Sequence, residues 1–281
     1  MAEQSVITLS RELRFALSGN ELSGLQSNNF AGNPPMRGLA AFCTVRACVA
    51  GAVDPATGML MNIRDMDRIL RQTAAPALRD FYLRTPAESP HSRDPAQVDA
   101  MPVAPLQKAA AEIRPLIAPH RLAVITAALS PFHALDLDFT RETPMIRMTQ
   151  RFEFSAAHRL HTDTLTAAQN AALFGKCNNP NGHGHNYELD VTIGGPVAAD
   201  TGRLIPVHEF QQAVNQRVIQ AFDHKHLNLD CPAFAGINPT VENIARIIFD
   251  LLHPAFPAPA KLLAVKVWET PKTWCEVTGE P

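Results

Sequence analysis

Residues 174–187 read FGKCNNPNGHGHNY, a stretch in which Cys177 stands six positions ahead of the first histidine of a His-Gly-His sequence. The residues that follow, 187–193, alternate apolar and polar side chains, which is the period of a half-buried strand. Extended backwards, that period places His183 and His185 on the apolar face of the strand, about 7 Å apart along it. Two imidazoles at this spacing can converge on one metal ion.

A second strand is predicted upstream and supplies a third histidine. Residues 151–158, RFEFSAAH, show the same alternation and bring His158 into phase with Phe152. A lone histidine is usually an ordinary hydrogen-bonded residue, but His158, His183 and His185 together face one site. Neutral imidazole suits Zn²⁺, and three protein ligands leave a fourth position for water or substrate, as in catalytic zinc sites. We therefore predict a zinc site with a cysteine beside it.

Five segments of the second half resemble, in the same order, the 6-pyruvoyl-tetrahydropterin synthase family. They are FSAAHRL (154–160), GKCNNPNGHGHNY (175–187), FDHKHLN (222–228), NPTVENIA (238–245) and VWET (267–270). The resemblance covers about residues 146–281. The family also contains 6-carboxytetrahydropterin synthase, which typically has a shorter spacing between the cysteine and the HGH sequence. The five residues between Cys177 and His183 resemble the pyruvoyl-forming branch.

The resemblance implies a lyase that eliminates triphosphate from 7,8-dihydroneopterin triphosphate and yields 6-pyruvoyl-tetrahydropterin. It implies one Zn²⁺ per chain, held by His158, His183 and His185 and bound to the side-chain oxygens of the substrate. The triphosphate of this substrate also allows for Mg²⁺ as a second cofactor. The partner is a small molecule, and the family's closed barrels imply a homo-oligomer with active sites at domain or subunit boundaries.

The resemblance also assigns roles to residues outside the metal site. Cys177 is expected to be the general base, and Asp223 with His224 a second proton-transfer group. Glu269 corresponds to the pterin anchor, whose carboxylate accepts hydrogen bonds from the 2-amino group and a ring N–H. His226 is not part of the family's signature, and we assign it a triphosphate contact at most.

Two residues near the expected second helix, Thr240 and Glu242, could belong to the pterin pocket. A helix cap and a charge in the first turn explain them nearly as well.

Three other functions are considered. The 6-carboxytetrahydropterin synthase reaction uses the same metal site and substrate but releases acetaldehyde. A non-catalytic pterin-binding or scaffold protein conflicts with the intact set of predicted catalytic residues. A zinc hydrolase is disfavoured because the sequence has no HExxH helix and no acidic cluster beside the histidines.

Composition narrows the class of partner. The formal charge of the 281 residues is -2, and no basic stripe indicates binding to nucleic acid. No apolar run approaches the roughly 20 residues of a membrane span, and the first residues lack the features of a secretory signal. The five cysteines show no disulfide spacing, which agrees with a reducing compartment. We expect a cytoplasmic protein.

The two halves of the chain repeat each other faintly. Phe30-Ala31-Gly32 precedes Leu173-Phe174-Gly175 by 143 positions, and Val49-Ala50-Gly51 precedes Thr192-Ile193-Gly194 by the same number. At this offset Pro34, Ala40 and Phe42 stand where Cys177, His183 and His185 stand, so the first copy has lost its ligands. We predict a degenerate scaffold domain over residues 1–143, a catalytic domain over 146–281 and a linker over 140–145.

The predicted fold class is α+β, with two tandem T-fold domains. Each is expected to contain an antiparallel four-stranded sheet with two helices on one face. In the second domain, helices are predicted over residues 206–222 and from about Asn238, with Pro239 in the first turn, to Pro254; strands are predicted over 261–270 and 274–278. Residues 85–105 are predicted to form a surface insertion.

Overall fold

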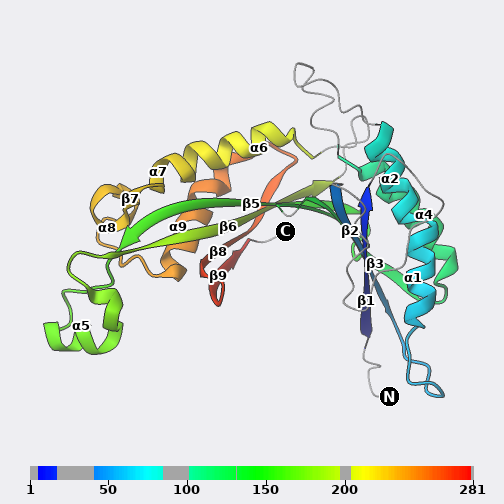
Figure 1. The fold of residues 1–281 in the computed structure, drawn as a ribbon, viewed down its shortest axis with the longest axis horizontal. Helices are drawn as coiled ribbons and strands as arrows, with labels where there is room; N and C mark the ends of the chain where they lie inside the picture. The colour runs from blue at the N-terminus through cyan, green and yellow to red at the C-terminus, as the bar shows by residue number, and fades with distance from the viewer. Residues whose placement is uncertain (1–5, 18–40, 85–100, 131, 197–203, 280–281) are drawn as a thin grey trace. The chain divides into compact units, whose positions relative to one another are not determined.

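The computed structural model describes residues 6–17, 41–84, 101–130, 132–196 and 204–279 (Figure 1). It divides into two compact units. The first comprises Met1–Met148 with Gly195–Leu204, and the second comprises Thr149–Gly194 with Ile205–Pro281. Both combine an antiparallel sheet with helices, which is the predicted α+β class. Among the described residues, no helix is both long and apolar enough to span a bilayer.

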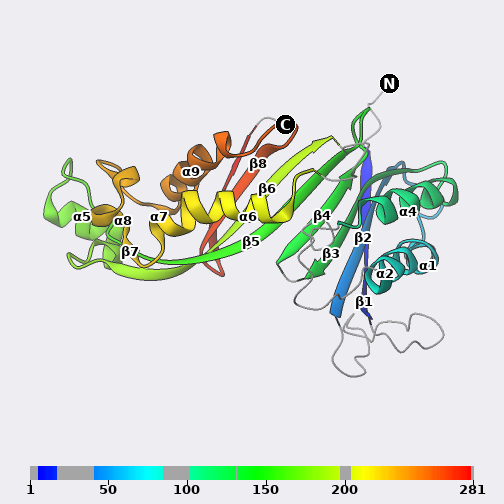
Figure 2. The same cartoon turned by 90° about the horizontal axis from the view of Figure 1, so that it is seen from above.

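The second unit is a sheet with the strand order β5-β6-β8-β9, where β8 is antiparallel to both of its neighbours. The strands are β5 (Met145–His158), β6 (His183–Pro196), β8 (Lys261–Thr270) and β9 (Thr273–Thr278), and a short β7 (Lys225–His226) pairs in parallel with β5. The helices are α5 (Ala167–Phe174), α6 (Val207–Val214), α7 (Gln220–Phe222), α8 (Leu227–Asp230) and α9 (Val241–Leu252). Figure 2 shows α6, α7 and α9 running alongside β5, β6 and β8.

The alternation predicted for β6 separates a buried face from a polar face. Tyr187, Leu189, Val191 and Ile193 are fully buried. On the buried face Phe152 meets Phe210 of α6 edge-on, with ring centroids 5.9 Å apart. On the other face, Arg151 binds Asp190 through two hydrogen bonds and Glu188 through a third, at 2.7 to 2.9 Å. The helices therefore cover the face that also carries the histidines.

The helical segment predicted over residues 206–222 forms α6, a π-helical turn (Asn215–Ile219) and α7. The predicted start of the next helix near Asn238, with Pro239 in its first turn, was wrong. The first helical residue of α9 is Val241, because Thr240 is in an extended conformation and its hydroxyl accepts a hydrogen bond from the backbone of Asn243. Pro239 thus precedes the cap.

The first unit is a sheet with the strand order β1-β2-β3-β4, antiparallel throughout. Its strands are β1 (Ile7–Leu17), β2 (Ala41–Gly51), β3 (Arg121–Ser130) and β4 (His133–Asp138); its described helices are α1 (Ile63–Gln72), α2 (Ala74–Arg84) and α4 (Val103–Leu116). Two strands, a helical part and two further strands follow one another, as they do in the second unit.

Two expectations for the first unit differ from the structure. Three described helices replace the predicted two, because α1 ends at Gln72, four residues before Pro76, and α2 begins at Ala74. Pro76 lacks the N–H that would continue the hydrogen-bonded ladder of α1, and its ring crowds the preceding turn. The predicted surface insertion extends too far, since Val103–Leu116 is α4 and Pro105 lies in its first turn, where the missing N–H costs nothing. Residues 85–100 of that insertion lie outside the described residues.

The hydrogen bond that Thr240 makes at the start of α9 predicts an effect on stability. We expect Thr240→Ala to lower the free energy of unfolding by about 1 kcal/mol, because the first turn of α9 loses a side-chain acceptor. Thr240→Ser keeps a hydroxyl and should unfold like the wild type. Urea denaturation followed by circular dichroism measures both, and equal stability of the three proteins would contradict the capping role.

Candidate functional site

Three histidines come together where β5 ends and β6 begins. His158 is the last residue of β5, and His183 and His185 lie at the start of β6 on one face. Their ring centroids are 4.6, 4.8 and 5.2 Å apart, and one nitrogen of each lies within 4.8 Å of those of the other two. In the described part of the chain, this is the group of side chains suited to a metal ion. The structure thus brings together the three predicted ligands.

The orientation of His158 is fixed by the backbone. Its Nδ1 lies 2.7 Å from the carbonyl oxygen of Pro239, which can only accept, so Nδ1 carries the proton and Nε2 presents a lone pair. That Nε2 lies 3.2 Å from Nε2 of His183. The buried Nε2 of His185 has no hydrogen-bond partner among the described residues. A second hydrogen bond that holds the far nitrogen of a ligand is a regular feature of metal sites.

The electrostatics of the site also suit a cation. Burial, above all, lowers the pKa of His158 to about 4, and the neighbouring imidazoles add to the effect. Burial likewise lowers the pKa of His185. These imidazoles are therefore neutral near pH 7, which is the form that binds metal. Three converging imidazole nitrogens fit Zn²⁺ better than Mg²⁺, which prefers oxygen ligands.

Glu269 extends from β8 towards the same histidines. Its Oε1 lies 3.5 Å from Nε2 of His158 and 3.8 Å from Nε2 of His185, and its side chain is 20% exposed. The ring of Tyr187, which has no exposed surface, lies next to that of His185, with centroids 5.6 Å apart. Its pKa is raised by burial and, to a lesser extent, by the carboxylate of Glu269 and the thiol of Cys177. Glu269 thus lies beside the metal-type cluster, as its predicted role requires.

Cys177 lies in a 3₁₀ turn (Gly175–Asn178) that follows α5. Its carbonyl accepts a hydrogen bond from the backbone N–H of Leu160, and the neighbouring Asn178 is bonded to Arg159 and His161. Burial and, secondarily, Glu269 raise the pKa of the thiol. The protein groups around Cys177 therefore favour the neutral thiol, and a nearby cation is what would favour the thiolate.

Asp223 and His224 form a tight pair after α7. Asp223 accepts a hydrogen bond of 2.8 Å from the backbone of Ser155 and lies 2.7 Å from Nδ1 of His224. The Ser155 bond is the main reason why the pKa of Asp223 is lowered. The side chain of His224 is 82% exposed, and its backbone has the uncommon φ of 56°.

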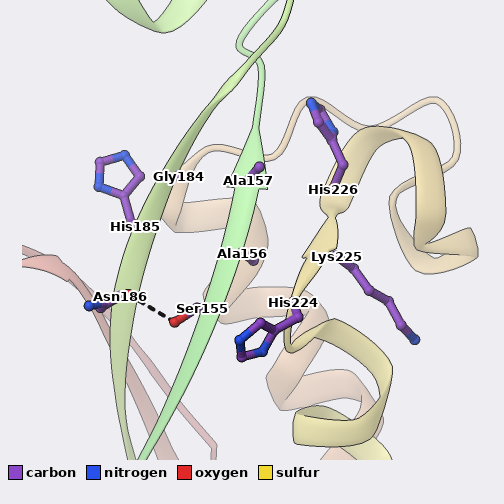
Figure 3. A pocket seen from close by; sticks show the side chains of 9 residues that line it. All are labelled: Ser155, Ala156, Ala157, Gly184, His185, Asn186, His224, Lys225 and His226. Carbon is purple, nitrogen blue, oxygen red and sulfur yellow. Dashed lines mark hydrogen bonds between the residues drawn. The ribbon is translucent and has the colours of Figure 1, made fainter.

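His224 borders a cavity of about 500 Å³ that His185 of the histidine cluster also lines. The cavity is lined by Ser155, Ala156, Ala157, Gly184, His185, Asn186, His224, Lys225 and His226. Figure 3 draws the ring of His185 on one side of the paired strands and that of His224 on the other. Among the described residues, no hydrogen bond or ion pair joins Asp223 or His224 to Cys177 or to the three clustered histidines.

The remaining predicted site residues have local explanations. Thr240 caps α9, and Glu242 lies in the first turn of that helix, where a negative charge is favourable. Burial and, secondarily, the charge of Glu242 raise the pKa of Cys275, so Glu242 lies near β9. Of the positions that the predicted repeat sets against Cys177, His183 and His185, Phe42 is an exposed residue of β2, and positions 34 and 40 lie outside the described residues.

Sequence reasoning missed the contacts that hold the turn before His183. Gly182 has a φ of 72°, and a Cβ there would come within 2.5 Å of Nε2 of His226 and 3.0 Å of the carbonyl of His158. His226 therefore packs against the turn that carries two of the clustered histidines. The only sequence signal was the glycine itself, because its partner is 44 positions away.

Comparisons with known proteins point to one family. The family model described as 6-pyruvoyl tetrahydropterin synthase matches residues 147–280. The 6-pyruvoyl tetrahydrobiopterin synthase of Drosophila melanogaster is 40% identical over 138 residues, which cover 49% of this chain and 82% of the relative. The Homo sapiens protein of the same name is 40% identical over 134 residues, 48% of this chain and 92% of the relative.

Two further matches lie at greater distance. The 6-carboxy-5,6,7,8-tetrahydropterin synthase of Haemophilus influenzae is 26% identical over 152 residues, covering 47% of this chain and 98% of that protein. The solved structure of Caenorhabditis elegans 6-pyruvoyl tetrahydropterin synthase is 35% identical, with a TM-score of 0.47, and the match covers 50% of this chain and all of that one.

The geometry of the three histidines predicts the metal content of the protein. We expect one equivalent of zinc per chain in the purified wild type and almost none in His185→Ala, because two imidazoles do not complete a zinc site. His253→Ala, an exposed histidine of the same unit, is the matched control and should keep its zinc. Elemental analysis measures all three, and two tightly bound equivalents in the wild type would mean that a second site exists elsewhere in the chain.

Proposed function

The chain belongs to the 6-pyruvoyl tetrahydropterin synthase family, and we propose that it converts 7,8-dihydroneopterin triphosphate into 6-pyruvoyl-tetrahydropterin with elimination of triphosphate. The observation that carries this proposal is the convergence of His158, His183 and His185 within 4.8 Å, with Glu269 alongside. These residues come from three strands, and each lies in a segment that resembles the family. The enzyme is accordingly a carbon–oxygen lyase.

The proposed metal is Zn²⁺, held by His158, His183 and His185. When bound, it supplies a Lewis acid that polarises the side-chain oxygens of the substrate and stabilises the charge that develops on them. The carbonyl of Pro239 keeps His158 in the tautomer that can serve as a ligand. Mg²⁺, as a companion of the triphosphate, has no carboxylate cluster to hold it among the described residues and would arrive with the substrate.

Cys177 is proposed to remove a carbon-bound proton of the substrate side chain. Because burial and Glu269 raise its pKa, the thiolate would form only once the site carries positive charge. Glu269 is proposed to accept the hydrogen bonds of the pterin 2-amino group and ring N–H. Its Oε1 lies 3.5 and 3.8 Å from the nitrogens of two imidazoles, which is too far for strong hydrogen bonds. The carboxylate can therefore still accept hydrogen bonds from the pterin.

Asp223 and His224 are proposed to supply the second proton transfer. Asp223 is held as a carboxylate by Ser155 and orients the imidazole of His224. Because His224 is largely exposed and unconnected to Cys177 among the described residues, it is free to serve a site completed by a neighbouring domain or subunit. This is the support that the structure offers for the predicted homo-oligomer.

The first unit is proposed to be a degenerate copy, over residues 1–143, of the catalytic domain over residues 146–281. Both units run through two strands, a helical part and two strands. The offset of 143 positions sets Phe42 against His185, but Phe42 lies on the exposed face of β2, whereas His185 shares the buried face of β6. A copy without ligands can still supply strands. β1 and β9 are each paired on one side only among the described strands, and such edges favour the closure of sheets into barrels.

The 6-carboxytetrahydropterin synthase reaction is the alternative, and the product decides between the two. We expect incubation with 7,8-dihydroneopterin triphosphate to release triphosphate without acetaldehyde. Cys177→Ala should keep its zinc and lose turnover by roughly 10² to 10⁴-fold, as is typical when a general base is removed. Mass analysis of the products and metal analysis of the variant test both statements. Loss of zinc from Cys177→Ala would make the cysteine a ligand, and release of acetaldehyde would identify the other reaction.

The scaffold role predicts an assembly. We expect the full chain to be a homo-oligomer by light scattering, and residues 146–281 alone to aggregate or to lose activity, because the catalytic unit then lacks the strand edges of its neighbour. A fragment that folds, keeps the assembly state and retains full activity would show that the first half is dispensable.

A further inference from the structure

Asn228 makes a pair of hydrogen bonds to the backbone next to the histidine cluster, and the mechanism proposed above gives it no role. Its Oδ1 accepts the backbone N–H of Arg159 at 2.8 Å, and its Nδ2 donates to the carbonyl of Arg159 at 3.0 Å. Only one orientation of the amide satisfies both groups, because a backbone N–H can only donate and a carbonyl can only accept. The side chain therefore holds both polar backbone groups of one residue.

This pair of bonds continues a short strand ladder. β7 pairs in parallel with β5 at Ala156 and Ala157, and Figure 3 shows its two residues alongside them. After His226 the chain turns into α8, so its backbone leaves the neighbouring strand. The amide of Asn228 carries the same donor and acceptor as a peptide group, and it pairs with the residue that follows the end of β5. The side chain thus replaces the backbone at this point of the ladder.

The segment that Asn228 holds leads directly to Cys177. The backbone N–H of Leu160 donates to the carbonyl of Cys177 at 2.8 Å. The guanidinium of Arg159 donates to the backbone carbonyl and to the side-chain oxygen of Asn178, both at 3.3 Å. Residues 159 and 160 therefore hold the 3₁₀ turn of the cysteine by their backbone and by a side chain.

The position of the thiol depends on that turn. Burial and the charge of Glu269 act on the thiol of Cys177, but among the described residues no hydrogen bond holds it. Its place in the site is consequently set by the backbone that carries it. A base must reach the proton that it removes to within hydrogen-bond distance, so a shift of this turn would slow proton transfer.

A role for Asn228 in holding the metal is the weaker explanation. His158 directly precedes Arg159, but its ring is already fixed by the bond of 2.7 Å between Nδ1 and the carbonyl of Pro239. The orientation of that ligand does not require Asn228.

We propose that Asn228 is a positioning residue for Cys177: by holding the backbone of Arg159, its amide fixes the turn that places the thiol against the substrate. The inference rests on the proposed function, since it presupposes that Cys177 removes a proton of the substrate. It adds a residue that acts on the reaction through the cysteine.

The test is the kinetics of the zinc-loaded full-length protein with 7,8-dihydroneopterin triphosphate. We expect Asn228→Ala to lower kcat about tenfold and to leave KM within about twofold, because a displaced base slows the chemical step without weakening substrate binding. Asn228→Asp keeps the acceptor for the N–H of Arg159 and loses only the donor to its carbonyl, so kcat should fall about threefold. Both variants should keep one equivalent of zinc.

A double-mutant cycle provides a readout that a purely structural role would not give. In the Cys177→Ala background, Asn228→Ala should lower the residual rate by less than about twofold, because the group that it positions is absent. Single-turnover measurements with enzyme in excess make such slow variants measurable.

Asn62→Ala is the matched control. Asn62 also accepts a backbone N–H through its side chain, that of Arg64 at 2.9 Å, and it caps α1 of the first unit. Its loss should lower the unfolding temperature and change neither kcat nor KM.

The possible outcomes separate this inference from the function on which it rests. A wild type that does not turn over 7,8-dihydroneopterin triphosphate would overturn both. An active wild type would overturn the positioning role alone if Asn228→Ala had an unchanged kcat, lost its zinc, or lost as much activity in the Cys177→Ala background as in the wild type. If Asn228→Ala does not fold, the same three results for Asn228→Asp decide the question.

Discussion

The hydrogen bond between Nδ1 of His158 and the carbonyl of Pro239 is the constraint on which the site depends. It joins the end of β5 to the loop before α9, residues 81 positions apart, and it decides which nitrogen of a fully buried imidazole carries the proton. Only the tautomer that it selects presents a lone pair to the cluster. The bond also explains why the proline precedes the helix: its carbonyl belongs to the site, and the helix begins after it.

The buried histidines face a cost that a metal would offset. One nitrogen from each of three imidazoles lies within 4.8 Å of the other two, and burial lowers the pKa of His158 to about 4. A metal ion binds the neutral form of such rings and would stabilise the set. Protonation of one ring is disfavoured, because the charged ring would lose its hydration and lie close to the other imidazoles. Glu269 adds the negative charge that a divalent cation at this place would favour. The same arrangement places the acceptor for the proposed substrate next to the proposed Lewis acid.

The two units have a similar order of strands and helices but different residues on the faces of their strands. In the second unit the histidine face of β6 continues inward as Tyr187, Leu189 and Val191, all fully buried. In the first unit β2 also alternates, but its buried residues include Cys43, Val45, Ala47 and Val49, and the exposed Phe42 lies on the other face. Strand formation depends on the alternating pattern, whereas chemistry depends on a few positions at the end of a strand.

The sequence alone determined the features that depend on local period and spacing. The phase of β5 and β6 put three histidines on one face, and the strands over Lys261–Thr270 and Thr273–Thr278 were predicted to within one residue. The sequence did not decide where α9 begins or that α1 and α2 are separate helices. Both depend on the position of a proline relative to the helix, Pro239 before α9 and Pro76 in the first turn of α2, and the backbone conformation decides that position. The bond from His158 to Pro239 and the packing of His226 against Gly182 join distant segments. Only the tertiary structure could decide them, because the register between strands and the path of loops set which side chains meet, and neither is encoded in the spacing of residues along one segment.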